Sequence, residues 1–268
     1  MSKNMKNEMN QNKLTFAMIG SGRVATHLAP ALNNSGMICQ GVYSPTYQNA
    51  QTLAQKIGCP ALKSLEEVVS LSVDFVLLSI KDDALEGVAA QFPADYPHPL
   101  IHTSGSTPLE VLKSVPHYGV LYPMQTFSKE RTLDIQEVPF FIEANDDDTL
   151  QLLHILIQKM GVKVSHPLSS EGRGRLHLAS VFACNFTNHL YAVADEVLGD
   201  LGLELKVLEP LMKETMEKAL THPPKEVQTG PAIRGDEQTM QRHLNLLEQK
   251  PELHKLYKML SDSIQNQK

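Results

Sequence analysis

The sequence predicts an α/β fold, a doubly wound and mostly parallel sheet, followed by an all-helical C-terminal domain. Short apolar runs alternate with amphipathic segments over the first two-thirds of the chain, as in strands joined by right-handed helical crossovers. After Leu168 the strand-like runs stop and long helical segments take their place. A length of 268 residues also suits two domains.

The elements of the first part are read from apolar runs and from the glycines that end helices. Residues 75–80 form a nearly continuous apolar run, which is typical of a central parallel strand buried on both faces. Glycines follow the first two expected helices, 23–34 and 47–57, at Gly36 and Gly58. The predicted strands are 14–19, 37–44, 75–80, 100–103, 120–122 and 139–143.

The expected helices of the second part are 171–201, 205–220, 236–249 and 252–265, with proline and glycine breaks before the third. The predicted division is a disordered tail over 1–13, a nucleotide-binding domain over 14–167 and a helical domain over 168–268.

A glycine-rich turn lies where the first expected strand passes into the first expected helix. Residues 20–25 read Gly-Ser-Gly-Arg-Val-Ala, the GxGxxA form of the Rossmann dinucleotide fingerprint. The first glycine permits a tight turn, the second lets the backbone approach a pyrophosphate, and the helix N-terminus attracts the anion. The predicted cofactor contacts of this turn are Gly20, Ser21, Gly22, Arg23 and Val24.

The end of the second strand favours NADP over NAD. NAD-binding versions usually carry an acidic residue there to hold the ribose hydroxyls, but no Asp or Glu occurs from Cys39 through Leu65. An acid would repel a 2′-phosphate, whereas Ser44 and Thr46 can donate hydrogen bonds to one and Arg23 can reach it. The alternative is that Ser44 and Thr46 are ordinary turn residues.

Two further strand ends are expected at the ligand-binding edge of the sheet. Ser79, Ile80 and Lys81 follow the strand at 75–80 and would line the nicotinamide side, while the neighbouring acids could simply cap a helix. Ser104 lies in the small polar turn after the strand at 100–103. That turn reads His-Thr-Ser-Gly and lacks the GxSxG elbow of a hydrolase.

Together these motifs resemble a bacterial Rossmann-like family classed with the deazaflavin-dependent NADP oxidoreductases, whose C-terminal helical domain has no assigned function. The chain is more distantly similar to pyrroline-5-carboxylate reductase and the β-hydroxyacid dehydrogenases. The resemblance implies a nicotinamide-binding domain and a helical domain that dimerises. Tyr122 stands where the family pattern has histidine. The segments that carry the resemblance are 20–25, 77–82, 102–105, 122–127, 177–185 and 229–236.

The expected helix around 176–194 contains no charged residue, so we expect it to be buried. His177, Cys184 and Asn188 share a stripe on one side, and Leu178 and Phe182 begin an apolar face opposite that reads as core, continued by Phe186, Leu190 and Val193. Buried imidazole and amide groups need hydrogen-bond partners. Those partners are a substrate and nicotinamide, or alternatively other helices or a second subunit.

His177 is the predicted proton donor, because an imidazole titrates near neutral pH and can protonate a heteroatom as hydride reaches the adjoining carbon. Asn185 is expected to orient the substrate. Arg234 suits a carboxylate or phosphate, or alternatively a surface salt bridge. The predicted function is an NADP(H)-dependent oxidoreductase that acts on a small metabolite in an interdomain cleft. A metabolite that carries a carboxylate is one option. The alternatives are an NADP(H)-binding sensor without catalysis and a purely structural dimer, and nothing in the residues selects a deazaflavin.

Composition excludes several other classes. The net charge of −6, the lack of Lys/Arg runs and the absence of Trp disfavour nucleic acid as a partner. The three cysteines form no CxxC pair, the histidines lack ligand spacing, and the three acids at 146–148 read as a helix start, so no metal site is predicted. No apolar run reaches membrane length, and the N-terminus does not resemble a signal peptide. The sequence predicts a cytoplasmic protein, with a homodimer formed through the helical domain.

Overall fold

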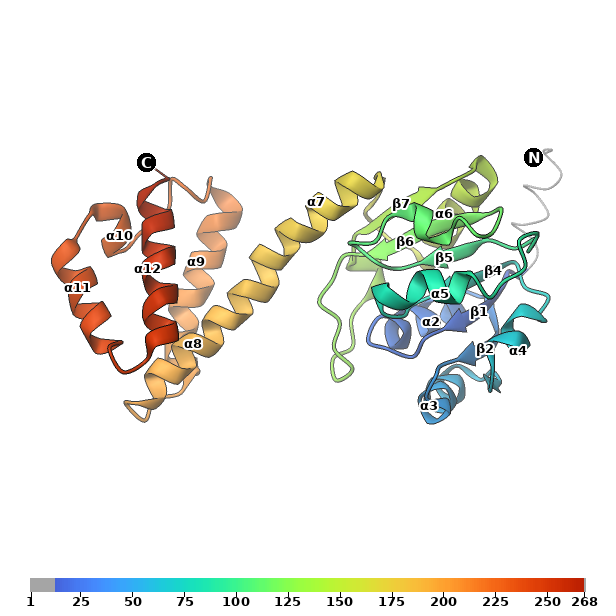
Figure 1. Ribbon diagram of the computed structural model, residues 1–268, viewed down its shortest axis with the longest axis horizontal. Coiled ribbons are helices and arrows are strands. Elements are labelled where there is room, and N and C mark those ends of the chain that lie inside the picture. The colour runs from blue at the N-terminus through green and yellow to red at the C-terminus, as the bar shows by residue number, and fades with distance from the viewer. Residues whose placement is uncertain (1–12, 268) are drawn as a thin grey trace. The chain divides into compact units, whose positions relative to one another are not determined.

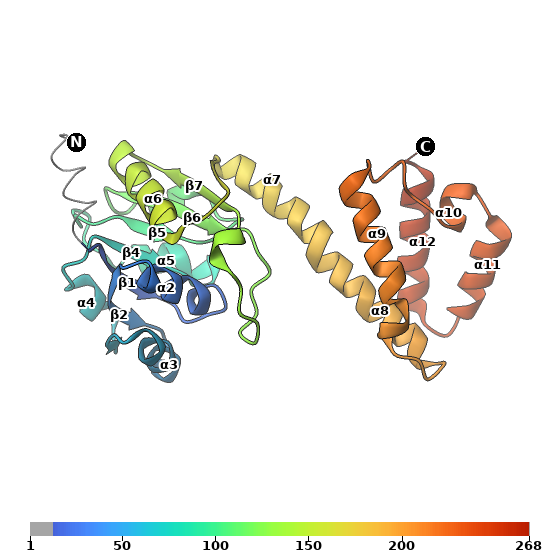
Figure 2. The ribbon, with the colours of Figure 1, turned by 180° about the vertical axis from the view of Figure 1, so that it is seen from behind.

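The structure, a computed structural model, describes residues 13–267, which form two compact units that meet at Cys184 and Asn185. Figures 1 and 2 show a unit of strands and helices followed by a unit of helices alone. Apart from Lys13, the predicted tail over 1–13 lies outside the described residues.

The first unit contains one eight-stranded sheet in the order β3-β2-β1-β4-β5-β6-β7-β8. All neighbouring strands run parallel except β6 and β7, which are antiparallel. The strands are β1 (Thr15–Ile19), β2 (Ile38–Tyr43), β3 (Ala61–Leu62), β4 (Phe75–Leu78), β5 (Leu100–His102), β6 (Tyr118–Pro123), β7 (Phe140–Ala144) and β8 (Ser165–Pro167).

Helices cover both faces of this sheet, since alternate residues of each strand belong to different cores. Phe16 and Phe75 pack with α2, α3 and α6 on one face. Ala17 and Val76 pack with α4 and α5 on the other. These helices are α2 (Ala25–Asn34), α3 (Tyr47–Ile57), α4 (Leu65–Val69), α5 (Leu85–Ala89) and α6 (Asp147–Met160).

Sequence-encoded caps fix several of these helix ends. Gly58 ends α3 in the left-handed conformation with φ of +72°. Asp146 begins α6, because its carboxylate accepts a hydrogen bond from the Thr149 backbone amide at 2.8 Å. The acids at 146–148 therefore start a helix, as predicted.

The remaining helical elements begin with α7 (Ser170–Ser180), a π-helical stretch (Val181–Phe186) and α8 (Thr187–Gly199), which follow one another along the chain. The division between the two units falls inside this helical stretch. The predicted boundary at residue 167 lies just before it, and as a statement about autonomous domains it stays a prediction. The other helices are α9 (Glu209–Thr221), α10 (Pro231–Arg234), α11 (Glu237–Leu246) and α12 (Pro251–Gln265).

The predicted fold class is confirmed, with two differences in the sheet. The short edge strands β3 and β8 were not predicted, because two or three residues are too few to show a period. β7 was predicted as a strand, and its antiparallel direction agrees with the connection after β6, which contains one short 3-10 turn (Ile135–Glu137) and not the crossover α-helix that usually joins parallel strands.

The expected core face of the helix at 176–194 is not buried within the chain. Leu178 is 56% exposed, Phe182 61% and Leu190 37%. Since α7, the π-helical stretch and α8 carry these side chains outward, an uncharged helix here does not mean a buried one.

None of the helices within residues 13–267 is long and apolar enough to cross a membrane. In the same range, no three His, Cys, Asp or Glu side chains gather as metal ligands.

Candidate functional site

The turn after β1 is the tightest part of the predicted dinucleotide site. Gly20 has φ of +110°, and its amide donates to the carbonyl of Tyr43 at 2.8 Å. A Cβ at Gly20 would lie 2.1 Å from the carbonyl oxygen of Ser79, so only glycine fits between β1 and β4. Beside it, Gly22 has open space where a side chain would stand.

This turn leads into α2 at the point where the order of the sheet reverses. β1 has β2 on one side and β4 on the other, and ligands of open α/β sheets bind at such a switch point. No side chain caps the start of α2, where Val24 is the N-cap residue. The helix N-terminus therefore keeps donors that suit a pyrophosphate.

The end of β2 carries hydroxyl groups and no acid. Ser21 donates to the Ser44 hydroxyl at 2.9 Å, and Ser44 is buried. Thr46 is the N-cap residue of α3, but its side chain forms no capping hydrogen bond and is exposed at the surface. Arg23 is exposed nearby in sequence and forms no ion pair within the described residues.

The ends of β4 and β5 supply a second polar cluster. Ser79 is buried and its amide donates to the carbonyl of Ile19 at 2.8 Å, Ile80 is half-buried, and Lys81 is exposed. Asp82 accepts a hydrogen bond from the Ser106 hydroxyl at 2.5 Å, which ties the loop after β4 to the turn after β5. Partial burial acts to raise the pKa of Asp82, but the hydroxyls around it outweigh this effect and hold the pKa below its usual range.

Within the turn after β5, the Ser104 hydroxyl accepts from the amides of Ser106 at 3.2 Å and Thr107 at 3.0 Å. His102, at the end of β5, is fully buried, and its Nδ1 accepts from the Ser104 amide at 3.1 Å. Burial and the nearby Arg173 cation lower the pKa of His102 to about 3, so the imidazole is neutral.

A buried arginine, which the sequence did not single out, fixes the first turn of α7 to this site. Arg173 is 1% exposed and forms an ion pair with Glu143 at the end of β7. Its guanidinium also donates to the carbonyls of Ser104 at 3.2 Å and Thr107 at 2.5 Å. Ser170 completes the network, since its hydroxyl donates to Glu143 at 2.7 Å. A single Arg among ordinary helix residues gives no sequence signal, and its partner lies 30 positions away.

His177 lies one turn after Arg173 on the same face of α7. Its Nδ1 is 3.3 Å from the hydroxyl oxygen of Tyr122 at the end of β6, with the two rings edge to face at 71°. Gly105 lies against both, because a Cβ there would be 2.7 Å from Tyr122 and 2.8 Å from His177. The residue that departs from the family pattern, Tyr122, is therefore the partner of the predicted proton donor.

The other two predicted catalytic residues belong to the second unit. Asn185 is exposed just after the division, and Arg234 is exposed at the end of α10. Asp236 begins α11 and accepts from the amide of Thr239 at 3.1 Å, as expected of an N-cap. The structure brings His177 to the site of the first unit, and the roles of Asn185 and Arg234 stay predictions.

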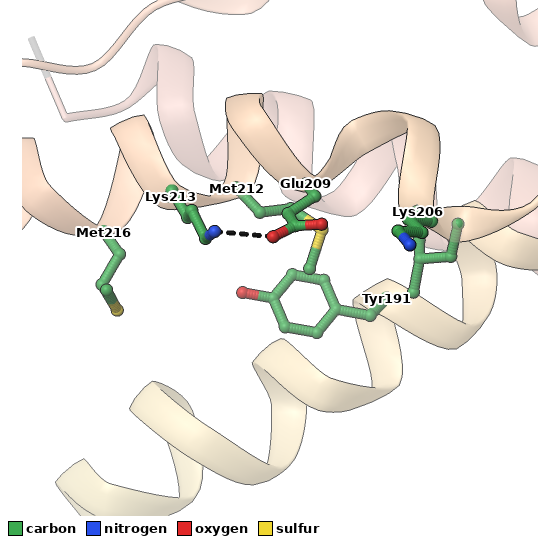
Figure 3. Close-up of a pocket in the computed structure, with 7 residues that line it drawn as sticks. Tyr191, Lys206, Glu209, Met212, Lys213 and Met216 are labelled. Atoms are coloured by element: carbon green, nitrogen blue, oxygen red, sulfur yellow. Dashed lines mark hydrogen bonds and ion pairs between the residues drawn. The ribbon is translucent and has the colours of Figure 1, made fainter.

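The second unit contains two hollows of its own. One, of about 340 Å³, is lined by Tyr191, Leu205, Lys206, Glu209, Met212, Lys213 and Met216. Figure 3 shows the Tyr191 ring extending toward Met212 beside the Glu209–Lys213 ion pair. The other, of about 490 Å³, is an apolar groove of α8, α11 and α12 that includes Leu190 and Leu246. Its polar groups, His243 and Tyr257, bond each other at 2.8 Å.

The residues of the first unit fit NADP. The glycine cradle at residues 20–22 lets a pyrophosphate approach the start of α2, and the hydroxyls at the end of β2 face no competing carboxylate. The fold and this site together define a Rossmann-like protein with an additional helical domain.

Family models agree with this class. Residues 1–125 match the Rossmann-like domain, and residues 138–264 match a domain of unknown function, DUF2520. A Bacteroides fragilis protein named as a putative NADP oxidoreductase is 39% identical, with a TM-score of 0.84 over 95% of this chain and 98% of that one. The chain belongs to the family of that protein. The predicted oxidoreductase class and NADP cofactor are confirmed at the level of the family.

More remote structures share the fold. A pyrroline-5-carboxylate reductase from Coxiella burnetii is 17% identical, with a TM-score of 0.57 over 96% of this chain and 97% of that one. An imine reductase from Myxococcus stipitatus, solved with NADP⁺, is 16% identical, with a TM-score of 0.64 over 94% and 92%. No curated protein sequence matches the chain.

Proposed function

We propose that this protein is an NADP(H)-dependent oxidoreductase that reduces a carbonyl or imine group of a small metabolite at the carboxyl edge of its sheet. The observation that carries the proposal is the tight turn at Gly20, where the backbone of Ser79 leaves no room for a side chain. This turn lies at the switch point of the sheet, beside the uncapped start of α2. The 39% identity to a protein named as a putative NADP oxidoreductase supports the same class, and the fold shared with imine reductases suggests that imines be tested first.

The adenosine side favours NADP over NAD. Ser44 and Thr46 offer hydroxyl donors to a 2′-phosphate, and Arg23 adds an exposed cation at the start of the adjoining helix. The absence of a carboxylate at the end of β2 removes the group that would repel a phosphate. At the other end of the dinucleotide, the nicotinamide would be bordered by Ser79, Ile80, Lys81 and Ser104.

Once bound, the dinucleotide supplies the hydride. His177 then donates the proton: Nε2 of its imidazolium protonates the substrate oxygen or nitrogen, which takes the electron pair of the C=O or C=N bond as hydride reaches the carbon. The imidazole ends neutral, and the substrate gains one hydride and one proton. We assign Asn185 and Arg234 to substrate orientation, with Arg234 suited to a carboxylate on the substrate.

Binding is tested first, by calorimetry of the full chain with NADPH and with NADH. We expect NADPH to bind at least about tenfold more tightly, a difference of ~1.4 kcal/mol. Tighter binding of NADH would contradict the assignment of the 2′-phosphate contacts, and no binding of either would leave only a structural role.

Turnover is tested by anaerobic NADPH oxidation with cyclic imines and small carbonyl compounds, each with and without a carboxylate. His177→Ala should lower kcat by about 10²–10⁴-fold, the usual contribution of a general acid. His189→Ala, an exposed histidine further along the same helical stretch, is the matched control. Tight NADPH binding without hydride transfer to any compound would favour the sensor alternative.

We also propose that the helical unit forms a homodimer. Among residues 185–267, Ala232 is the only apolar side chain that is buried. Leu220 and Leu246 are about four-fifths exposed, at 79% and 80%, and an apolar groove runs between α8, α11 and α12. A helical unit needs to bury an apolar face to be stable, and a second copy of the chain offers the matching surface.

A further inference from the structure

The segment that follows β6 has no role in the proposed function, although residues 122–127 are among those that carry the family resemblance. Because β6 runs parallel to β5, the two strands end at the same carboxyl edge of the sheet, where a dinucleotide binds. Tyr122, at the end of β6, lies against Gly105 in the turn after β5, and its hydroxyl oxygen is 3.3 Å from Nδ1 of His177. The segment therefore begins at the turn that is proposed to border the nicotinamide.

The same segment ends at the first turn of α2. Phe127 is buried, and the centroid of its ring is 5.2 Å from that of His27, the third residue of α2. Nε2 of His27 donates to the carbonyl of Ser128 at 2.7 Å, which fixes the backbone there. The start of α2 is the proposed pyrophosphate position. Residues 123–126 therefore connect the nicotinamide side of the site to the pyrophosphate side, and in a dinucleotide the nicotinamide ribose lies between these two groups.

Gln125, in the middle of this segment, is exposed and has its side-chain amide held in one orientation. Its Oε1 accepts from the backbone amide of Thr126 at 2.8 Å and from the Thr126 hydroxyl at 3.2 Å. Since a backbone amide can only donate, the atom that faces it is the oxygen and not the nitrogen. Within residues 13–267, no group accepts a hydrogen bond from Nε2 of Gln125. The segment thus presents an oriented NH2 donor that has no acceptor in the described part of the chain.

We propose that Gln125 binds the nicotinamide-ribose half of NADPH, its Nε2 donating to an oxygen of the ribose or of the nicotinamide carboxamide. The inference rests on the proposed function, in which NADPH binds at this edge of the sheet. The hydroxyls and the carboxamide oxygen of that half are uncharged acceptors, which an uncharged amide donor matches. The phosphates are left to the start of α2 and to Arg23.

The test replaces the donor and keeps the acceptor. In Gln125→Glu an oxygen still accepts from Thr126, but a carboxylate oxygen takes the place of the NH2 group. Calorimetry of the full chain should show NADPH binding at least about tenfold more weakly than to wild type, because a hydrogen bond is lost and a charged acceptor faces another acceptor. Thermal unfolding without ligand should match wild type. Gln136→Glu, an exposed glutamine of the same connection, is the matched control for the added charge and should bind NADPH like wild type.

A second ligand locates the contact on the dinucleotide. Adenosine 2′,5′-bisphosphate carries the adenosine and the 2′-phosphate but no nicotinamide ribose. We expect it to bind wild type, Gln125→Glu and Gln136→Glu with equal affinity. If Gln125→Glu weakens this compound as much as NADPH, the contact does not lie on the nicotinamide half and the inference is overturned.

The outcomes separate this inference from the proposed function. A role of Gln125 in loop structure alone predicts that Gln125→Glu binds NADPH like wild type, since the bond to Thr126 is kept. That result overturns the inference and leaves the proposed function standing. If wild type binds neither NADPH nor adenosine 2′,5′-bisphosphate, the proposed function fails and the inference fails with it.

Discussion

The two units of this protein differ in how they bury their apolar side chains. In the first, strand residues such as Phe16, Val76 and Leu78 are fully buried between helices on both faces of the sheet. In the second, within residues 185–267, Ala232 is the only buried apolar side chain. The first unit therefore contains its own core. The second has the apolar side chains that a core needs, but almost all of them are exposed. The sheet unit is therefore stabilised within one chain, and the exposed apolar residues of the helical unit are the basis of the proposed dimer.

The first prediction concerns the buried network of the sheet unit and carries the largest effect. Arg173→Met should destabilise the protein by about 3–5 kcal/mol, because Glu143 is left largely buried without its cation. Urea unfolding measures the loss. Arg175→Met is the matched control, since Arg175 pairs with Glu171 at the surface and such pairs contribute at most ~1 kcal/mol. Equal effects of the two substitutions would show that burial of Arg173 does not matter to the first unit.

A second prediction concerns how the stability of the sheet unit depends on pH through His102. The pKa of His102 is about 3 in the folded protein against 6.5 for a free imidazole, so the unfolded chain binds the extra proton first. The stability tied to neutral His102 is present above pH 6.5 and is lost as pH falls toward 3. Between pH 6.5 and 4.5 the loss is roughly 2 kcal/mol. His102→Gln should flatten this part of the stability curve, and an unchanged slope would contradict the assignment.

The third prediction tests the helical unit. Leu190→Glu places a charge in the apolar groove of α8, α11 and α12 and should weaken dimerisation about a hundredfold, ~2.7 kcal/mol. Light scattering over a concentration series measures it. His189→Glu alters the exposed neighbouring position and should leave the dimer intact. A wild-type protein that is monomeric at all concentrations would remove the contrast between the two units.

The smallest effect on folding is expected at Gly22. No atom lies within 4 Å of a Cβ built there, so Gly22→Ala should change the stability by less than about 0.5 kcal/mol. The methyl group would still stand where a pyrophosphate approaches, so NADPH affinity should fall about tenfold or more by calorimetry. Gly20→Ala should instead lose stability and binding together, because its Cβ meets the Ser79 carbonyl. Leu190→Glu should leave NADPH affinity unchanged if the nucleotide site belongs to the first unit alone.

Much of the sheet unit could be predicted because its signals are local. The fingerprint at residues 20–25, the buried run of β4 and the glycine that ends α3 each depend on neighbours in sequence. The predicted strands and helices therefore agree with the structure apart from their ends, and the short elements β3, β8 and α4 were not predicted. The preference for NADP also followed from a local feature, the missing acid after β2.

The parts that could not be predicted depend on distant partners. Arg173 and Glu143 form an ion pair only after β7 and α7 come together. No sequence pattern near either residue predicts this pair. Tyr122 was noticed as a departure from the family pattern, but its bond to His177 spans 55 positions. The apolar face of α7 and α8 was expected to be core, since a periodic pattern shows that a face is apolar without showing which surface covers it.

Gly105 carries a consequence for how this site can vary among relatives. Its Cα leaves no space for even a methyl group between the Tyr122 ring and His177 Nδ1. A larger residue at 105 is therefore compatible only with a smaller or displaced side chain at 122 or 177. The three positions are constrained as a set, and substitutions among relatives should occur at them jointly. A sequence that has lost Gly105 while keeping both rings would need a different arrangement of its proton donor.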